Sequence, residues 1–236
     1  LLEKGGWKFQ GNLNNRNKRV PTASYGTRVD ESGTYTADSR AFLEVSRDQA
    51  VAPDLTLTAR AYYYWYRYNA NYVYDQPSPP PEKLVNKDLG RTSWAGEEVL
   101  LRWTRFGKRN ALLLGQEYER NLEQLQRNYD EDPFNLVLDN NQRDQRWALF
   151  IQQELAPHDS LDLLLGLRYD RYQSFGNTVN PRIAAIHRPW KNGIVKLLYG
   201  SAFRAPIPYE MFFLGTGYKA NPTLRPETIR TFEVVL

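Results

Sequence analysis

The chain of 236 residues carries 31 basic and 27 acidic side chains, a formal net charge of +4, and no cysteine. These nearly balanced, scattered charges lack the basic block that nucleic-acid binding favours, and the absence of cysteine excludes disulfide bonds and thiol chemistry. No apolar run approaches the roughly 18 residues of a membrane helix, so none is predicted.

Alternation of apolar and polar residues with a period of two recurs along the chain and predicts an all-β, antiparallel structure. In residues 54–72 the apolar side runs from Leu55 to Trp65, and small residues give way to aromatic ones. From Leu161 to Tyr169, every second residue is leucine or tyrosine. About ten strands are predicted, near residues 6–13, 38–49, 54–73, 95–106, 111–127, 145–156, 161–174, 179–189, 194–203 and 228–236.

The predicted connections alternate in kind. Tight turns are expected at residues 49–53, 107–110, 157–160 and 190–193. Long polar connections are expected at residues 14–37, 74–94, 128–144 and 204–227. One connection, near residues 175–178, is short where a long one is expected. Short turns on one side and long loops on the other are typical of an antiparallel transmembrane β-barrel of the outer membrane.

Aromatic side chains are abundant, with 16 Tyr, 10 Phe and 6 Trp. They fit the aromatic girdles at the two interfaces of a membrane barrel. A sugar-binding β-sandwich would also be rich in aromatics, but it would show turn signals about every 8 to 12 residues. The turn signals in this chain are spaced roughly twice as far apart, and an extracellular β-sheet module would also need its apolar faces to meet each other.

No residue pattern predicts catalysis or a bound cofactor. The two histidines are predicted to be polar residues near turns, because the adjacent residues His158, Asp159 and Ser160 cannot converge on one substrate atom. Asp130, Glu131 and Asp132 could hold Ca²⁺, but they lack the spacing of a calcium loop, and a solvated loop is the preferred interpretation. No metal site is predicted.

Several charged residues fall on the polar side of the predicted strands. In an enzyme they could form acid/base pairs, whereas in a wide barrel they would form a charged inner wall that contacts water and an internal plug. The second interpretation is favoured for Glu98, Arg102, Glu117, Glu119, Glu154, Arg168, Lys196, Arg204 and Glu233.

The most specific sequence signal lies in residues 180–236. Phe203-Arg204-Ala205-Pro206 follows an alternating strand, and Asn221-Pro222-Thr223-Leu224 and Arg225-Pro226-Glu227-Thr228 open the next one. These ordered motifs resemble the barrel of TonB-dependent outer-membrane receptors. Residues 1–179 resemble that barrel only generically, through strand alternation and the rhythm of turns and loops.

This resemblance implies that residues 1–236 are part of a barrel of about 22 strands, whose plug domain and C-terminal strands lie outside this sequence. It also implies a place in the lipid of the outer membrane of a Gram-negative bacterium and contact with TonB through the plug region. The implied function is energised uptake of a ferric siderophore or similar iron complex. Uptake of cobalamin or another nutrient, or a passive porin-like channel, are the alternatives.

The resemblance also bears on the ligand. Haem receptors of this family carry a histidine between the two motifs, whereas residues 207–220 contain none, which disfavours haem. Aromatic residues on external loops suit a planar or catecholate iron chelate, through stacking and cation–π contacts. The candidate ligand-binding residues are Tyr72, Tyr74, Trp94, Tyr129, Tyr209 and Tyr218.

Overall fold

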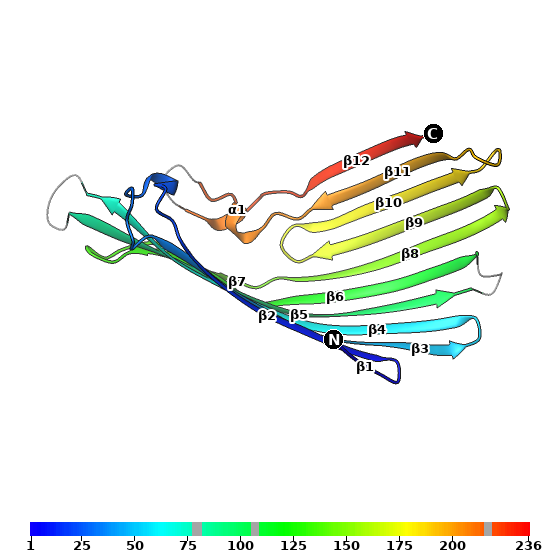
Figure 1. The fold of residues 1–236 in the computed structure, drawn as a ribbon, viewed down its shortest axis with the longest axis horizontal. Helices are drawn as coiled ribbons and strands as arrows, with labels where there is room; N and C mark the ends of the chain where they lie inside the picture. The colour runs from blue at the N-terminus through cyan, green and yellow to red at the C-terminus, as the bar shows by residue number, and fades with distance from the viewer. Residues whose placement is uncertain (77–81, 105–108, 215–218) are drawn as a thin grey trace.

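A computed structural model describes residues 1–76, 82–104, 109–214 and 219–236. These residues form one antiparallel sheet of twelve strands, which confirms the predicted all-β class (Figure 1). The elements are β1 (Leu2–Lys4), β2 (Trp7–Arg19), η1 (Ser24–Gly26), β3 (Tyr35–Ala52), β4 (Leu55–Asp75), β5 (Lys83–Trp103), β6 (Ala111–Asp130), β7 (Asn135–Gln142), β8 (Gln145–His158), β9 (Leu161–Tyr172), β10 (Gly176–His187), β11 (Val195–Arg204), α1 (Pro208–Phe212) and β12 (Glu227–Val235).

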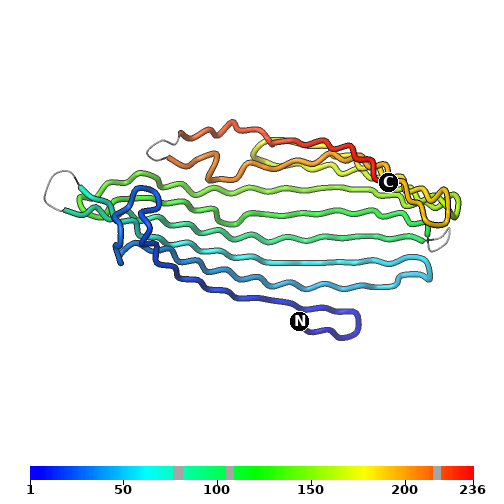
Figure 2. Tube along the Cα trace, turned by 45° about the horizontal axis from the view of Figure 1, so that its top comes forward, coloured from blue at the N-terminus to red at the C-terminus, as the bar shows by residue number. Residues whose placement is uncertain are grey.

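The strands follow one another across the sheet in chain order, except that β7 lies off this path and pairs with β6. One edge of β6 therefore has two partners, with residues 111–120 paired to β8 and residues 124–130 paired to β7. β1 and β12 lie at the two edges of the sheet, and Figure 2 shows the N-terminus and the C-terminus on opposite sides. The described sheet is therefore curved but open.

The connections differ between the two ends of the sheet. Short turns, including residues 53–54 and 159–160, gather at the turn end, which is on the right in Figure 1. Longer connections, including residues 20–34 and 205–226, lie at the opposite end, here termed the loop end. The short connection at residues 173–175 also lies at the loop end, close to its predicted position.

Three strands are unusually long. β4 and β5 contain 21 residues each and β6 contains 20. At about 3.3 Å per residue, 21 residues extend roughly 70 Å, whereas a strand of about 9–11 residues is enough to cross a bilayer. Figure 1 shows the loop ends of these strands projecting beyond those of β8 to β12. In the part of the chain that the structure describes, no helix combines the length and apolar character needed to cross a bilayer.

The twelve strands exceed the predicted ten, because neither β1 nor β7 carries a period-two signal. β2 continues to Arg19 and β5 begins at Lys83, so both strands extend into stretches predicted as loops. In these outer segments polar residues occupy both faces of the sheet, as in residues 83–92 of β5. Alternation marks a strand only when one face is apolar, and the sequence pattern therefore underestimates the strands at the loop end.

One side of the sheet, here termed the apolar face, carries the large hydrophobic side chains. The register aligns them across strands, so that Ile151 on β8 lies opposite Leu114 on β6 and Leu167 on β9. These side chains are exposed although they are apolar, and a contiguous apolar surface of this kind indicates contact with lipid or protein. Exposed members include Phe9, Leu43, Leu114, Leu149, Ile151, Leu165, Leu167, Ile183, Leu197 and Phe232.

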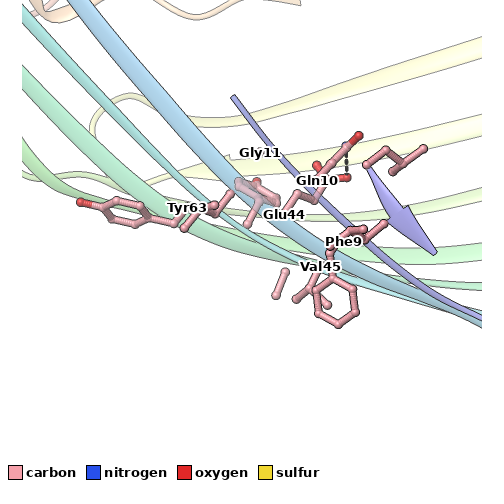
Figure 3. A pocket seen from close by; sticks show the side chains of 11 residues that line it. Phe9, Gln10, Gly11, Glu44, Val45 and Tyr63 are labelled. Atoms are coloured by element: carbon pink, nitrogen blue, oxygen red, sulfur yellow. Dashed lines mark hydrogen bonds between the residues drawn. The ribbon is translucent and has the colours of Figure 1, made fainter. Parts of the chain in front are cut away.

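The opposite side, here termed the polar face, carries the charged residues. Figure 3 shows the division at the β2–β3 edge, where Phe9 and Val45 project to one side and Gln10 and Glu44 to the other, joined by a 2.7 Å hydrogen bond. The strand register confirms that the residues predicted to share an inner wall do share this face, namely Glu98, Arg102, Glu117, Glu119, Glu154, Arg168, Lys196, Arg204 and Glu233.

The apolar face is limited to the half of the sheet nearer the turn end. On β4 its apolar residues run from Leu55 to Trp65, and Arg67 follows. On β9 they run from Leu161 to Tyr169. This length matches the roughly 9–11 residues of a membrane-crossing strand, and aromatic residues end the band as they do at a membrane interface. The outer halves of β4, β5 and β6 therefore lie beyond the apolar band.

Candidate functional site

On the polar face, nearer the turn end, hydrogen-bonded groups from six strands form a charged ladder. Its first part is Arg60 on β4, whose guanidinium lies between Glu44 on β3, at 3.4 Å, and Glu98 on β5, at 3.3 Å. The same guanidinium lies 5.1 Å from the centre of the Tyr62 ring. The ladder consists of Glu44, Arg60, Tyr62, Glu98, Glu117, Glu119, Arg146, Arg168 and Asp170.

Tyr62 connects β4 to β6 across the intervening strand. Its hydroxyl donates to Glu119 at 3.1 Å and reaches Glu117 at 3.4 Å, although both carboxylates are on β6. The ring passes over Gly96 of β5, where an added Cβ would lie 2.4 Å from ring atoms. A glycine at this position therefore allows the tyrosine to lie flat on the sheet and reach its carboxylate partners.

Glu117 is the centre of the ladder. It is 8% exposed and accepts hydrogen bonds from Arg146 on β8, at 2.7 Å, and from Arg168 on β9, at 2.8 Å. Arg168 also contacts Asp170, which is 1% exposed. One carboxylate thus holds two guanidinium groups from different strands, and the network fixes the relative positions of β6, β8 and β9.

Towards the loop end, the polar face carries an aromatic wall. Its centre is a row of three rings from three strands, in which Tyr64 stacks on Phe42 at 5.4 Å and on Trp94 at 5.1 Å, with an interplanar angle of 6° in the second pair. The other members are tyrosines of β4 that lie two or four residues apart and therefore share this face. The aromatic wall consists of Phe42, Tyr64, Tyr66, Tyr68, Tyr72, Tyr74 and Trp94.

The phenols of the wall are held in defined positions. Tyr66 donates to Asp38 at 2.6 Å, and the hydroxyls of Tyr68 and Tyr72 lie 2.6 Å apart. Tyr25 of η1 contacts Tyr72 edge to face at 5.6 Å. Burial raises the pKa of Tyr72 and of Tyr74, so both remain neutral hydrogen-bond donors. The wall can therefore offer ring faces and neutral hydroxyls to a ligand.

Asp88 lies on the same face of β5, opposite Ala70 on β4 and Asn128 on β6. Burial raises the pKa of its carboxyl, and hydrogen bonds from Asn128 and the Leu89 backbone oppose this shift. A carboxyl with a raised folded pKa stabilises the fold below its unfolded pKa of about 3.9, and this contribution is lost as the pH rises through the folded pKa. At neutral pH, the ionised Asp88 therefore opposes folding of the outer segment.

We expect Asp88→Asn to stabilise the outer half of β5 at neutral pH, because the amide removes a buried negative charge. Hydrogen exchange of residues 83–92 should show greater protection in the variant at pH 7, and the difference should shrink as the pH falls through the raised pKa of Asp88 and be absent below about 4. Glu82→Gln, at the exposed residue directly before this strand, is the control and should leave the protection unchanged. Equal protection of wild type and Asp88→Asn at pH 7 would contradict the prediction.

The structure brings only some of the sequence-predicted ligand residues together. Tyr72 and Tyr74 on β4 and Trp94 on β5 share the aromatic wall. Tyr129 lies on the other face of β6, where its ring contacts Arg127 at 5.4 Å and Phe134 at 5.8 Å. Tyr209 lies in α1 and stacks on Phe213 at 4.5 Å, whereas Tyr218 lies outside the described residues.

Sequence reasoning did not identify Phe42 and Tyr64 as site residues. Both lie inside predicted strands rather than loops, and their role depends on which strands are neighbours. The alternation of Tyr62, Tyr64 and Tyr66 along one face was the available signal. Arg40 is a further addition, because it lies opposite Tyr66 on the same face and is exposed.

The first sequence motif forms an ion-pair clasp at the start of the connection between β11 and β12. Arg204 donates to both oxygens of Glu210 in α1, at 2.9 and 3.0 Å, and to both oxygens of Glu227, at 2.7 and 3.1 Å. The second oxygen of Glu210 also accepts the Ile207 backbone N–H at 3.1 Å. Ala205 and Pro206 lead from Arg204 into this short helix.

The remaining motif residues complete this connection. Phe203 packs against Tyr172 and Phe175, with ring centres 5.9 and 6.5 Å away. Asn221 donates its backbone N–H to the Met211 carbonyl at 2.8 Å, and its side chain accepts the Thr223 hydroxyl at 2.9 Å. Further along lie Pro222 in this turn and Pro226 directly before β12. Through these contacts, the motif residues hold the connection between β11 and β12 in place, and they do not form an open pocket.

The structure also places the residues that were considered for catalysis or metal binding. His158 contacts the hydroxyl of Ser160 at 2.9 Å in the turn before β9. Asp130 accepts from Asn86 at 2.8 Å, and Glu131 pairs with Lys87 at 3.2 Å. Within the described ranges, no three His, Cys, Asp or Glu side chains are grouped as a metal site would require.

The sequence profile of the TonB dependent receptor-like β-barrel family matches residues 3–236. The chain belongs to this family. Its members are transport receptors of the Gram-negative outer membrane, not enzymes. The family accounts for the two-faced strands, the short turns at one end and the connections at the other. No curated protein matches the chain.

Solved structures agree on the fold. The siderophore receptor PirA from Acinetobacter baumannii superposes with a TM-score of 0.67 at 14% identity over 99% of this chain and 38% of its own. The ferric-catecholate import receptor Fiu from E. coli has a TM-score of 0.65 at 13% identity, over 97% of this chain and 46% of its own. The RagAB peptide transporter has a TM-score of 0.61 at 11% identity, over 98% of this chain and 36% of its own.

The chain therefore spans less than half the length of these family structures. At these identities the likeness concerns the fold alone. A barrel with the same architecture serves siderophore receptors and a peptide transporter, so the cargo depends on side chains rather than on the sheet.

Proposed function

We propose that the protein containing this chain imports a ferric siderophore or a similar iron complex across the outer membrane of a Gram-negative bacterium. The observation that carries the proposal is the aromatic wall on the polar face, which runs from the level where the apolar band ends towards the loop end, in a barrel of the TonB-dependent receptor family. In this arrangement the apolar face contacts lipid and the polar face lines the lumen.

The chemistry of the wall favours a planar, oxygen-rich chelate. The stack of Phe42, Tyr64 and Trp94 presents extended ring surface, and neutral phenols such as Tyr72 can donate hydrogen bonds. Arg40 adds positive charge beside the wall, which suits the negative charge of a ferric catecholate. Tyr74 belongs to the same surface. Tyr209, in α1, would contact the ligand only from the connection between β11 and β12, whereas Tyr129 is on the opposite face of β6 and points away from this surface.

Energised transport requires parts outside this chain. We infer that a plug region contacts TonB, that residues 1–236 are one part of a larger barrel, and that the charged ladder faces that plug. This division of roles supports transport without chemistry on the cargo, so no resident cofactor is required.

The ligand surface can be tested with Trp94→Ala in the full-length protein. Loss of the stacked indole should weaken binding of the ferric chelate by about 1–2 kcal/mol, roughly five- to thirtyfold in Kd. Trp94→Phe keeps a stacked ring and should recover most of the affinity. Trp147→Ala removes a tryptophan from the opposite face and should leave the affinity unchanged. Equal affinities for wild type and Trp94→Ala, measured by titration calorimetry, would contradict the assignment of the wall.

The function itself is tested in iron-starved cells that lack the protein. They should lose uptake of one ferric chelate while haem uptake continues, and deletion of TonB should abolish uptake of the same chelate. Uptake that persists without TonB would indicate a passive channel. Loss of cobalamin uptake instead would show that the family assignment holds but the cargo is different.

A further inference from the structure

The apolar face carries a repeated pair of residues where its apolar band ends. On β4, Trp65 is followed two positions towards the loop end by Arg67, and on β6 Tyr118 is followed by Arg120. β9 and β12 repeat the arrangement with the pairs Tyr169–Arg171 and Phe232–Arg230. Residues two positions apart in a strand share a face, so each arginine stands directly beyond an aromatic residue on the apolar face.

The pair recurs although the strands are staggered. Tyr118 lies opposite Trp147 on β8, whereas Tyr169 lies opposite Leu149, one register row nearer the turn end. The aromatic residues therefore step towards the turn end from β4 to β12. A strand tilt of about 35–45° brings such staggered positions to one level of a membrane barrel. The arginines step with them, which places them at one level above the aromatic girdle.

None of these four arginines has a protein counter-charge among the described residues. Arg67, Arg120, Arg171 and Arg230 are exposed, and no ion pair within 4.0 Å involves any of them among the described residues. The carboxylates of the polar face are on the other side of the sheet. These four guanidinium groups therefore have unused hydrogen-bonding capacity at the edge of an apolar surface.

A fifth arginine adds repulsion between like charges, which a bound anion would reduce. Arg91 on β5 is the direct cross-strand partner of Arg67, and like charges directly opposite each other destabilise a sheet. Glu123 reaches Arg91 at 3.4 Å and offsets part of this repulsion, whereas Arg67 has no such partner among the described residues. An external anion between the two strands would relieve the repulsion.

We propose that Arg67, Arg91, Arg120, Arg171 and Arg230, here termed the arginine belt, bind the phosphate groups of lipids in the outer leaflet. The proposal goes beyond cargo import and uses only the membrane location of the proposed function. Guanidinium groups match phosphate oxygens in a bidentate fork, and the adjacent aromatic residues place the belt at the headgroup level. A free phosphate ion would satisfy the charge but not use the apolar surface immediately below.

The test uses full-length protein purified in detergent and native mass spectrometry to measure bound lipid. Diphosphorylated lipid A is the probe, with its dephosphorylated form and inorganic phosphate as the other arms. The triple variant Arg67→Gln, Arg120→Gln, Arg171→Gln should bind the phosphorylated probe at least about tenfold less than wild type. The dephosphorylated lipid should bind both proteins equally weakly, and inorganic phosphate should not displace the bound lipid.

Two controls separate the belt from a general loss of charge or fold. Arg47→Gln removes an arginine from the same face nearer the turn end, where its guanidinium lies 5.0 Å from the Trp7 ring, and should leave binding unchanged. The triple lysine variant keeps the charges without the fork and should bind more lipid than the glutamine variant. Equal binding by wild type and the glutamine variant, or equal binding of phosphorylated and dephosphorylated lipid, would overturn the proposal.

Discussion

Ile151→Arg is expected to destabilise the folded protein in a bilayer by about 2–4 kcal/mol. Ile151 is 45% exposed, lies between Leu114 and Leu167, and is midway along the apolar face of β8. If that face contacts lipid, the substitution places a charge near the bilayer midplane, where water cannot solvate it. The measurement is the free energy of unfolding of the full-length protein in lipid vesicles, from a denaturant titration.

The adjacent residue provides a matched control. Gln152 is one position along β8 and therefore points to the polar face, where its amide donates to Glu154 at 3.0 Å. Gln152→Arg introduces the same side chain into the same strand but towards water, and it should change the stability by no more than about 0.5 kcal/mol. A similar loss in both variants would show that the strand tolerates no arginine on either face and would contradict a lipid-facing apolar band.

Glu117→Ala is expected to be the most destabilising single change in the charged ladder. Its removal leaves the guanidinium groups of Arg146 and Arg168 without the carboxylate they share. Breaking a fully buried ion pair costs about 3–5 kcal/mol, and because a third of the Arg168 side chain is exposed we expect about 2–4 kcal/mol. The same unfolding experiment in vesicles measures it.

Glu154→Ala is the comparison for this variant. Glu154 lies on the same face but approaches Arg102 only to 3.8 Å, and the two side chains are 37% and 45% exposed. An exposed pair of this kind contributes about 0–1 kcal/mol, so the variant should be nearly as stable as wild type. If Glu117→Ala costs no more than Glu154→Ala, the network of Glu117, Arg146 and Arg168 does not contribute to stability as proposed.

The two faces of the sheet were predictable because they depend on single strands. The alternation in residues 55–65 and 161–169 indicates which side chains share a face, and the structure confirms the apolar band and the wall of charged residues. The same reasoning misplaced the start of β5 by twelve residues, at 95 instead of 83, because polar residues occupy both faces of its outer half. Alternation of apolar and polar residues appears only when the two faces of a strand differ in polarity, so it cannot reveal a strand that has water on both sides.

The candidate site was predictable only in part. Tyr72, Tyr74 and Trp94 were selected as loop aromatics, and the structure places them on strands, on one wall. The central contact of that wall joins Phe42, Tyr64 and Trp94, which are 22 and 30 residues apart in sequence. No local pattern connects them, because the contact depends on the pairing of β3, β4 and β5.

The sequence by itself determined that this chain forms two-faced strands, how they alternate with turns, and, through the motifs around Arg204 and Asn221, the family to which it belongs. Only the tertiary structure decided which residues meet. Side-chain alternation is fixed within each strand by backbone geometry, whereas the arrangement of the aromatic wall, the Glu117 network and the arginine belt depends on register and stagger between strands. Register is a property of the assembled sheet, set by cross-strand packing and turn lengths rather than by any one segment.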